Sequence, residues 1–249
     1  MNRVALITGV AGGIGQAIAP CFKLEGWYVI GIDQKPNPGL AGIDCYIHAD
    51  AADPQKIVEA IAHIAQTAGR LDALINNAAI QVCKPVVETS IAEWDRVMEV
   101  NLRSVFLWSK TAYSLLRASQ GSIVNVSSVH AVATSANIAA YAASKGALVA
   151  FTRALAIEFA ADQIRVNAIL PGAVDTPMLR AGLERVHLAG TNLTELMHQL
   201  GQKTVMGRVG QPEEIAQAIL FLADNHRSAF MTGQALVIDG GATIRLSTE

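Results

Sequence analysis

The sequence predicts a single-domain α/β fold, in which a doubly wound parallel sheet of about seven strands carries helices on both faces. Short apolar runs alternate with longer helical segments, which is typical of parallel strands covered on both sides. A glycine-rich turn follows the first apolar run, and an acidic residue ends the second. The 249 residues contain no linker or repeat, so we expect one domain over residues 1–249.

Each element follows from its local pattern. Strands are expected at 4–7, 29–32, 45–48, 74–76, 122–126, 166–170 and 235–238, and helices at about 13–24, 54–67, 91–117, 139–160 and 213–223. Pro54 is suited to the first position of its helix, and an alanine-rich run favours helix from Ala139 onward. The periodicity weakens over residues 178–205.

The composition bounds the class of protein. With 51% hydrophobic and 16% charged residues, the chain can bury a large core. A net charge of −2 without basic runs argues against a nucleic-acid partner. The three cysteines indicate a reducing compartment rather than a disulfide framework, and no run reaches the ~18 apolar residues of a membrane span. We expect a soluble cytoplasmic protein with no metal site.

The stretch Thr8–Gly15, TGVAGGIG, lies between the first strand and the first helix. Glycines there allow a tight turn and a close approach to a pyrophosphate at the helix N-terminus. Asp33 at the end of the second strand can accept hydrogen bonds from ribose hydroxyls and would repel a 2′-phosphate. Lys35 is nearby, but the loop itself has no cation. The pattern predicts a Rossmann-type site that prefers NAD(H) to NADP(H).

Tyr141 and Lys145 are four residues apart in a predicted helix, so they share one face. A nearby ammonium favours the phenolate and lowers the pKa of the phenol, which would allow proton transfer. Ser128 could hold the reacting oxygen. Taken alone, the spacing is more often an ordinary surface pair, so the interpretation depends on the other motifs.

Together with Asn76–Asn77–Ala78–Ala79, these motifs resemble the short-chain dehydrogenase/reductase family, and the likeness spans essentially the whole chain. Ala79 replaces the glycine usual in the family. The resemblance implies the catalytic residues Asn101, Ser128, Tyr141 and Lys145. It implies cofactor contacts from Thr8, Gly9, Gly13, Ile14, Gly15, Asp33, Asp50, Asn77, Tyr141, Lys145, Pro171, Gly172, Val174 and Thr176.

The resemblance also implies roles. Tyr141 would be the general acid/base in interconverting a secondary alcohol and a ketone, Lys145 would bind the nicotinamide ribose, and Asn101 would anchor a water of the proton relay. Asp50 would meet the adenine amino group, and Thr176 the nicotinamide carboxamide. A homotetramer is expected, with one dimer face on the helices ending near residues 117 and 160 and another on residues 213–223 and the last strand.

Substrate residues are less defined. Gln81, His130 and Asn137 lie where the family builds its pocket, and a lid is expected at about 176–207. Gln81 and His130 resemble a carboxylate-binding pair of 3-hydroxybutyrate dehydrogenases, but Ile138 stands where those enzymes have a lysine. A polyol, sugar or other small hydroxy or keto compound is therefore at least as plausible as a hydroxy acid. Basic residues of the lid could supply an anion contact: Arg180, Arg185, His187, His198 and Lys203.

Two other functions stay open at this point. The first is a non-catalytic dinucleotide-binding sensor or scaffold, which the complete set of four catalytic residues argues against. The second is an epimerase or dehydratase on the same fold, which the sequence excludes only weakly. A screen of hydroxy acids, sugars and polyols that follows NADH absorbance would separate them.

Overall fold

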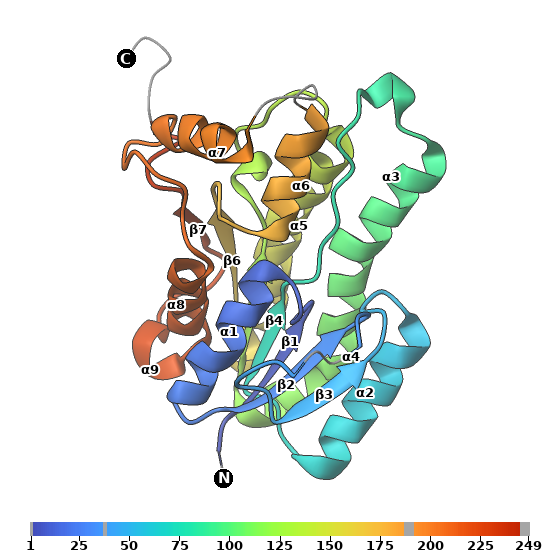
Figure 1. Ribbon diagram of the computed structural model, residues 1–249. Helices are drawn as coiled ribbons and strands as arrows, with labels where there is room; N and C mark the ends of the chain where they lie inside the picture. The colour runs from blue at the N-terminus through green and yellow to red at the C-terminus, as the bar shows by residue number, and fades with distance from the viewer. Residues whose placement is uncertain (1, 37–38, 187–191, 245–249) are drawn as a thin grey trace.

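The computed structural model describes residues 2–36, 39–186 and 192–244 and confirms the predicted single-domain architecture (Figure 1). Its strands are β1 (Val4–Thr8), β2 (Tyr28–Asp33), β3 (Cys45–His48), β4 (Ala73–Asn76), β5 (Ser122–Val126), β6 (Arg165–Pro171) and β7 (Ala235–Ile238). All neighbours pair in parallel in the order β3-β2-β1-β4-β5-β6-β7. The strand order reverses between β1 and β4, and such a switch point opens a crevice at the carboxyl ends of the strands.

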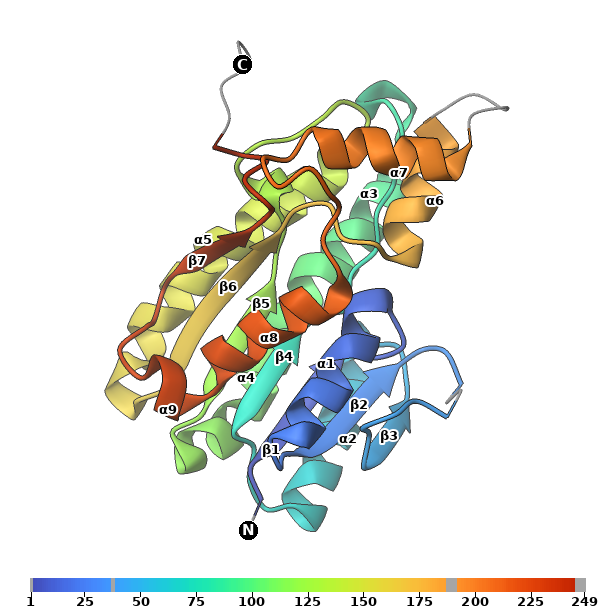
Figure 2. The ribbon, with the colours of Figure 1, turned by 60° about the vertical axis from the view of Figure 1, so that its left-hand side comes forward.

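Helices cover both faces of the sheet, as Figure 2 shows. One face carries α1 (Gly13–Leu24), α8 (Pro212–Ala223) and the short α9 (Asn225–Ser228), and the other carries α2 (Pro54–Thr67), α4 (Ser104–Ser119) and α5 (Ala139–Phe159). Phe22 and Ile219 are fully buried on the first face, and Ile57 and Leu116 are almost or fully buried on the second. Each such side chain contributes roughly 1.5–3 kcal/mol by leaving water, so the two apolar layers stabilise the sheet between them.

Local signals fix several helix ends. Asp53 caps α2 by accepting hydrogen bonds from the amides of Gln55 and Lys56, just before the expected proline. Ser90 and Glu93 form a capping box that begins α3 (Ile91–Met98). Short 3₁₀ turns cover Val86–Glu88, Val129–Ala131 and Ala160–Asp162.

The long helix expected over residues 91–117 is interrupted. A π-helical turn at Glu99–Arg103 separates α3 from α4. Ser104, the first residue of α4, donates its hydroxyl to the carbonyl of Val100 in this turn at 2.6 Å, and the Asn101 side chain hydrogen-bonds to Ile80 and Ser144 outside the turn. The extra residue of a π turn turns the Asn101 side chain inward, and the sequence pattern does not reveal such an insertion.

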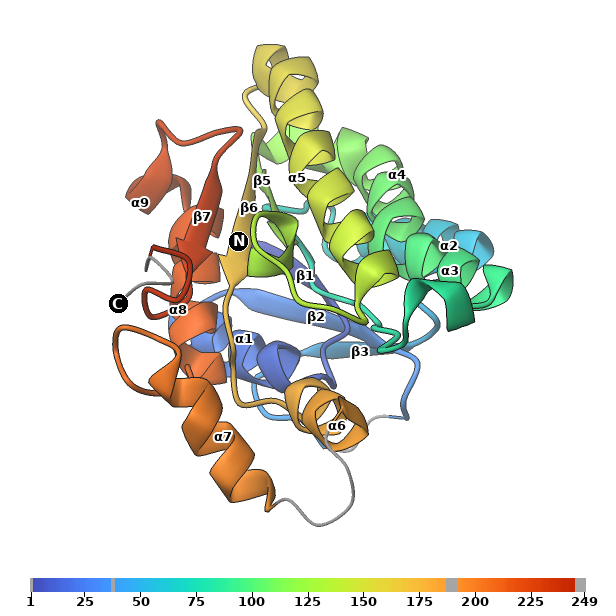
Figure 3. The ribbon, with the colours of Figure 1, turned by 90° about the horizontal axis from the view of Figure 1, so that it is seen from above.

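The predicted lid region contains two helices, α6 (Pro177–Val186) and α7 (Leu193–Gln202). Seen from above, they lie beyond the carboxyl ends of the strands on the side of α1 (Figure 3). Residues 187–191, including His187, lie outside the described residues. No helix in the described ranges is long and apolar enough to cross a membrane.

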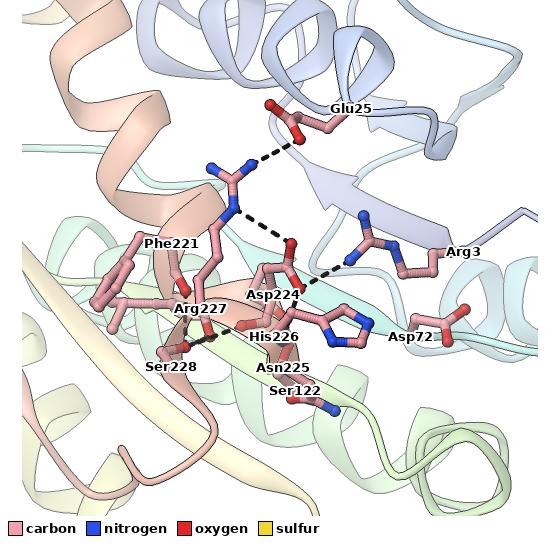
Figure 4. Close-up of polar contacts among 12 residues, drawn as sticks. Arg3, Glu25, Asp72, Ser122, Phe221, Asp224, Asn225, His226, Arg227 and Ser228 are labelled. Carbon is pink, nitrogen blue, oxygen red and sulfur yellow. Dashed lines mark hydrogen bonds and ion pairs between the residues drawn. The ribbon is translucent and has the colours of Figure 1, made fainter.

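A network of ion pairs lies at the amino ends of the strands, opposite the lid helices (Figure 4). Arg3 lies 2.8 Å from Asp224, and Arg227 lies 2.6 Å from Glu25 and also pairs with Asp224. Asp72 accepts the amide of Val4 at 2.8 Å. The network ties the entry of β1 to α1 and to the corner between α8 and α9.

Candidate active site

A cavity of about 800 Å³ runs along the carboxyl ends of the strands. The predicted residues that line it are Gly9, Gly13, Ile14, Asp33, Asp50, Asn77, Gln81, Ser128, His130, Asn137, Tyr141, Lys145, Pro171, Gly172, Val174 and Thr176. Three predicted residues, Thr8, Gly15 and Asn101, lie behind this lining. Most of the predicted site residues therefore line one cavity, and Thr8, Gly15 and Asn101 lie buried beneath its wall.

Three glycines of the loop, Gly9, Gly13 and Gly15, have no room for a side chain. Gly9 has a φ of +67°, and a Cβ there would lie 2.7 Å from the Cα of Ala78. A Cβ on Gly13 would lie 2.7 Å from the Cγ2 of Thr176, and one on Gly15 would lie 2.7 Å from the Cα of Val10. The bare backbone thus forms the cavity wall at the start of α1, where free N–H groups and the helix dipole favour a phosphate.

Thr8 and Asn77 lock this loop to the end of β4. The Thr8 hydroxyl accepts the amides of Asn77 and Ala78, each at 3.1 Å. The Asn77 side-chain amide donates to the carbonyls of Thr8 and Gly9, each at 3.0 Å. Asn76 is buried deeper and donates to the Oδ1 of Asn125 at 2.9 Å. This ladder positions the glycine loop before any ligand arrives.

Asp33 stands at the end of β2 and is only 8% exposed. Its Oδ2 accepts the amide of Ala11 at 2.9 Å, and its Oδ1 accepts the amide of Lys35 at 3.0 Å. The carboxylate is thereby fixed beside the glycine loop, where it lines the cavity. A glycine cradle, a helix N-terminus and an adjacent carboxylate fit the pyrophosphate and ribose of a dinucleotide.

Farther along the same wall lies Asp50, beyond the end of β3. Its Oδ1 accepts the amide of Ala52 at 2.9 Å, and its Oδ2 pairs with Arg96 at 2.5 Å. Burial raises the pKa of Asp50, but these bonds outweigh it and hold the pKa below its usual value. Arg96 lines the cavity as well, and no local pattern marks it because its partner Asp50 is distant along the chain.

Ser128, Tyr141 and Lys145 come together at the other end of the cavity. Lys145 donates to the carbonyl of Val126 at 2.7 Å, and its carbonyl accepts the Ser127 hydroxyl at 2.9 Å. These two bonds join the end of β5 to the first turns of α5. Lys145 Nζ lies 5.5 Å from the centre of the Tyr141 ring, and Ser128 is hydrogen-bonded to the phenol.

The pKa values in this group differ from the expectation that Lys145 lowers that of Tyr141. Burial raises the pKa of Tyr141 to about 12, although the hydrogen bond from Ser128 opposes it. Burial also lowers the pKa of Lys145 to about 7. Both charged forms are disfavoured because the two side chains are removed from water. In this state the phenol is protonated and suited to donate a proton.

Asn101 is fully buried beneath the cavity and hydrogen-bonds to residues on two other segments. Its Oδ1 accepts the amide of Ile80, and its Nδ2 donates to the carbonyl of Ile80 and to the hydroxyl of Ser144. Ser144 in turn donates to the carbonyl of Tyr141 at 2.7 Å. Both N–H groups of Asn101 are occupied by protein, so a relay water would need the remaining acceptor capacity or the backbone. Ser144 is a link that the motif comparison missed.

The predicted substrate residues have protein partners. Gln81 donates to the carbonyl of Met178 in the first turn of α6 at 2.9 Å. The Nδ1 of His130 lies 2.9 Å from the Thr134 hydroxyl, and its ring meets that of Tyr141 edge-on at 5.8 Å. Burial lowers the pKa of His130, which favours the neutral ring. Asn137 has a φ of +64°, a conformation that asparagine tolerates better than most residues.

The segment after β6 closes the cavity toward the lid. A Cβ on Gly172 would lie 2.7 Å from the Cβ of Asp239, so this turn also needs glycine. Val174 forms a bridge with Gly210, and the Thr176 hydroxyl accepts the amide of Leu179 at the start of α6. The basic lid residues separate: Arg180 pairs with Asp175 at 2.7 Å, whereas Lys203 lines the cavity.

Comparisons with known proteins agree with this geometry. Residues 9–243 match the family model described as enoyl-(acyl carrier protein) reductase. Cyclopentanol dehydrogenase of Comamonas sp. (strain NCIMB 9872) is 38% identical over 252 residues, with 97% of each chain covered. Meso-2,3-butanediol dehydrogenase of Serratia marcescens is 33% identical, with 97% of this chain and 95% of that protein covered.

A solved structure has the same fold. Ligand-free aldohexose dehydrogenase of Thermoplasma acidophilum superposes with a TM-score of 0.93 at 34% identity, covering 99% of this chain and 96% of that one. The glycine loop, the Asn76–Ala79 stretch and the serine, tyrosine and lysine group occupy one cavity of this fold. The chain belongs to the short-chain dehydrogenase/reductase family of oxidoreductases.

Proposed function

We propose that this chain is an NAD(H)-dependent oxidoreductase that interconverts a neutral secondary alcohol and a ketone, with Tyr141 as general acid/base. One observation carries the proposal: Ser128, Tyr141 and Lys145 line the same cavity as the glycine loop and Asp33. A proton-transfer group and a dinucleotide cradle in one cavity are what hydride transfer between an alcohol and a nicotinamide requires.

The chain's own residues would handle the proton and the orientation. Ser128 would hold the substrate oxygen beside the Tyr141 phenol, to which it is already hydrogen-bonded. In ketone reduction Tyr141 gives its proton to that oxygen, and in alcohol oxidation the phenolate takes the proton back. A bound nicotinamide supplies the carbon that accepts or donates the hydride. A positive charge on Lys145 stabilises the phenolate form.

The preference for NAD(H) rests on Asp33. Its carboxylate is held beside the glycine loop by the amides of Ala11 and Lys35. A 2′-phosphate placed there would meet a fixed negative charge, whereas ribose hydroxyls can donate to it. Lys35 also lines the cavity, but its backbone rather than its ammonium is fixed by Asp33.

A neutral substrate is favoured over 3-hydroxybutyrate or another hydroxy acid. Gln81, one of the two residues that resemble a carboxylate-binding pair, gives an N–H to Met178. Ile138 is apolar and only 9% exposed, so it cannot neutralise a carboxylate. The similar proteins named for cyclopentanol, 2,3-butanediol and aldohexose support the same class.

The assembly is proposed to be a homotetramer in the cytoplasm. Between α4 and α5 an apolar groove is lined by Leu102, Phe106 and Phe151, and Ile157 on α5 is 80% exposed. On the other side Val237 of β7 is 38% exposed. These apolar surfaces support the two predicted dimer faces. A monomeric mass by light scattering at micromolar concentration would contradict the tetramer.

The function is tested by incubating the purified chain with NAD⁺ or NADP⁺ and a panel of compounds, while recording absorbance of the reduced coenzyme. The panel contains cyclic alcohols, diols, aldoses, polyols and 3-hydroxybutyrate. We expect turnover with NAD⁺ and a neutral secondary alcohol. Tight NADH binding without turnover of any panel member would favour a sensor, and a strong preference for 3-hydroxybutyrate would overturn the substrate class.

A further inference from the structure

The cavity extends past Asp33 to a pair of charged residues, Asp50 and Arg96. Asp50 follows β3, at one edge of the sheet, whereas Ser128 follows β5. Four strand spacings separate β3 from β5, which amounts to roughly 19 Å. Asp33 lies between these two ends, after β2. The Asp50 end is therefore on the side of Asp33 that faces away from Tyr141, where the base of a dinucleotide would extend.

Asp50 is held on two sides. The Ala52 amide donates to Oδ1 at 2.9 Å, and the Arg96 guanidinium donates to Oδ2 at 2.5 Å. A carboxylate offers about four lone-pair sites, so two remain for a donor in the cavity. The side chain is still 37% exposed. Asp50 thus presents a fixed acceptor edge to the cavity.

Arg96 is itself fixed from a second direction. Its Nη1 donates to the Oε2 of Glu99 at 2.8 Å, at the start of the π turn. Two carboxylates therefore accept hydrogen bonds from the two terminal nitrogens of one planar guanidinium, which limits its rotation. Arg96 comes from α3, and Asp50 from the loop after β3, so the pair joins two elements across the mouth of the cavity.

We infer that Arg96 is a positioning residue for coenzyme recognition, which orients Asp50 so that its free lone pairs accept a hydrogen bond from the adenine amino group. The inference rests on the proposed function, because it concerns the coenzyme of that site. Arg96 acts here through Asp50. Without it, binding must itself order the carboxylate, at a cost that corresponds to a roughly two- to tenfold weaker affinity.

The test compares NADH with its hypoxanthine analogue, in which a carbonyl replaces the adenine amino group. Dissociation constants are measured by fluorescence titration of the full chain. We expect the unmodified chain to prefer NADH, because the analogue turns an acceptor toward Asp50. In Arg96→Met, NADH affinity should fall roughly two- to tenfold, whereas affinity for the analogue should change little or improve. The ratio of the dissociation constant of the analogue to that of NADH, called the preference ratio, should therefore fall.

Three variants serve as controls. Arg103→Met removes another arginine that pairs with Glu99 but does not line this cavity, so the ratio should stay unchanged. Arg96→Lys should restore part of the ratio, since it keeps a cation next to Asp50. In an Asp50→Ala background, Arg96→Met should have no further effect on the ratio, because residues that act as one unit are not additive.

Several results would overturn the inference. Equal weakening of both coenzymes in Arg96→Met would show that the arginine acts without the amino group. An undiminished effect of Arg96→Met in the Asp50→Ala background would show the same. Equal binding of both coenzymes by the unmodified chain would remove the Asp50 contact but leave the oxidoreductase proposal intact, and binding of neither would remove both. If Arg96→Met fails to fold, Arg96→Gln gives the same readout.

Discussion

The ammonium nitrogen of Lys145 lies 2.7 Å from the carbonyl oxygen of Val126, at the last residue of β5. This bond holds the lysine in a fully enclosed place, where its charge has lost its hydration. The protein therefore keeps at the centre of its site a cation that is costly to charge. A group of this kind couples the stability of the fold to pH.

The first prediction concerns that coupling. The pKa of Lys145 is lowered from 10.5 to about 7, so between these values the unfolded chain binds more protons than the folded one. This residue therefore makes stability rise as pH increases from about 7 toward 10.5. Urea unfolding at several pH values should show that Lys145→Met has a smaller rise than the unmodified chain.

Lys110→Met is the matched control, because Lys110 lies on the exposed side of α4 beside the Phe106 ring. Its pH dependence should follow that of the unmodified chain. Parallel stability curves for Lys145→Met and the unmodified chain would contradict the prediction. The opposite trend, a fall above pH 10, belongs to Tyr141, whose pKa is raised from 10.0 to about 12.

The second prediction is that Tyr141→Phe keeps the fold and NADH binding but loses most turnover. General acid/base catalysis contributes typically ~10²–10⁴-fold, and no other phenol lines the cavity among the described residues. Stopped-flow or steady-state kinetics measure the loss. Tyr113→Phe removes a remote hydroxyl that bonds to Asp162 and should leave turnover unchanged. Near-normal turnover in Tyr141→Phe would exclude it as the acid/base.

The third prediction concerns coenzyme choice. The unmodified chain should use NAD(H) much better than NADP(H), and Asp33→Ala should narrow that gap by removing a fixed negative charge. Asp33→Asn keeps one of the two oxygens that accept the amides of Ala11 and Lys35, so it should narrow the gap with less damage to the loop than alanine. The measurement is kcat/KM for both coenzymes. Equal values in the unmodified chain would contradict the assignment.

The fourth prediction is that Gln81 fastens the lid. Its amide donates to Met178 of α6, and a Cβ on Gly182 would lie 2.9 Å from its Nε2. Gly182→Ala should therefore displace the Gln81 side chain, although alanine favours helix by roughly 1 kcal/mol. We expect both Gln81→Ala and Gly182→Ala to raise KM for the substrate, and the double variant to resemble either single one.

A lid that is held in this way should also become more accessible when the bond is lost. Limited proteolysis or hydrogen exchange over residues 177–186 measures this directly. Gly146→Ala is a control, because Gly146 lies inside α5 and a Cβ there would only touch Ala131 at 4.0 Å. Strictly additive KM effects in the double variant would show that Gln81 and Gly182 act separately.

The fifth prediction tests His130. Replacing it with leucine should raise KM for the substrate far more than it changes NADH affinity, because the proposed mechanism assigns the proton transfer to Ser128 and Tyr141. Thr134→Val keeps the imidazole but removes its 2.9 Å partner, and it should give a smaller effect in the same direction. An unchanged KM in His130→Leu would leave the residue as packing against Tyr141. A matching fall in kcat and kcat/KM would instead place it in the proton transfer.

The sequence was informative where a contact is local or where a motif repeats a known solution. The start of α2 follows from Pro54, and the parallel pairing of the sheet follows from the alternation of apolar runs and helices. The glycine loop and its partner acid are recognisable from their places after the first and second predicted strands. These features depend on neighbours within a few residues or on the topology of a parallel sheet.

Other features depend on partners far along the chain. The π turn that interrupts the expected long helix positions Asn101 against Ile80 and Ser144, and nothing in the local pattern marks it. Gln81 lines the cavity as predicted, but its bond to Met178 joins positions 97 residues apart, which no local pattern marks. The raised pKa of Tyr141 likewise comes from enclosure, which spacing to a lysine does not report.

The ion pairs of Arg3, Asp224 and Arg227 sit where the strands begin, whereas the cavity lies where they end. Changes at sites that share no partners usually have additive effects. An engineer seeking a heat-tolerant variant can therefore work at the amino ends of the strands, away from the residues that line the cavity. The usual trade between durability and activity should be weakest in a protein whose ion pairs and proposed reacting groups lie at opposite ends of the strands.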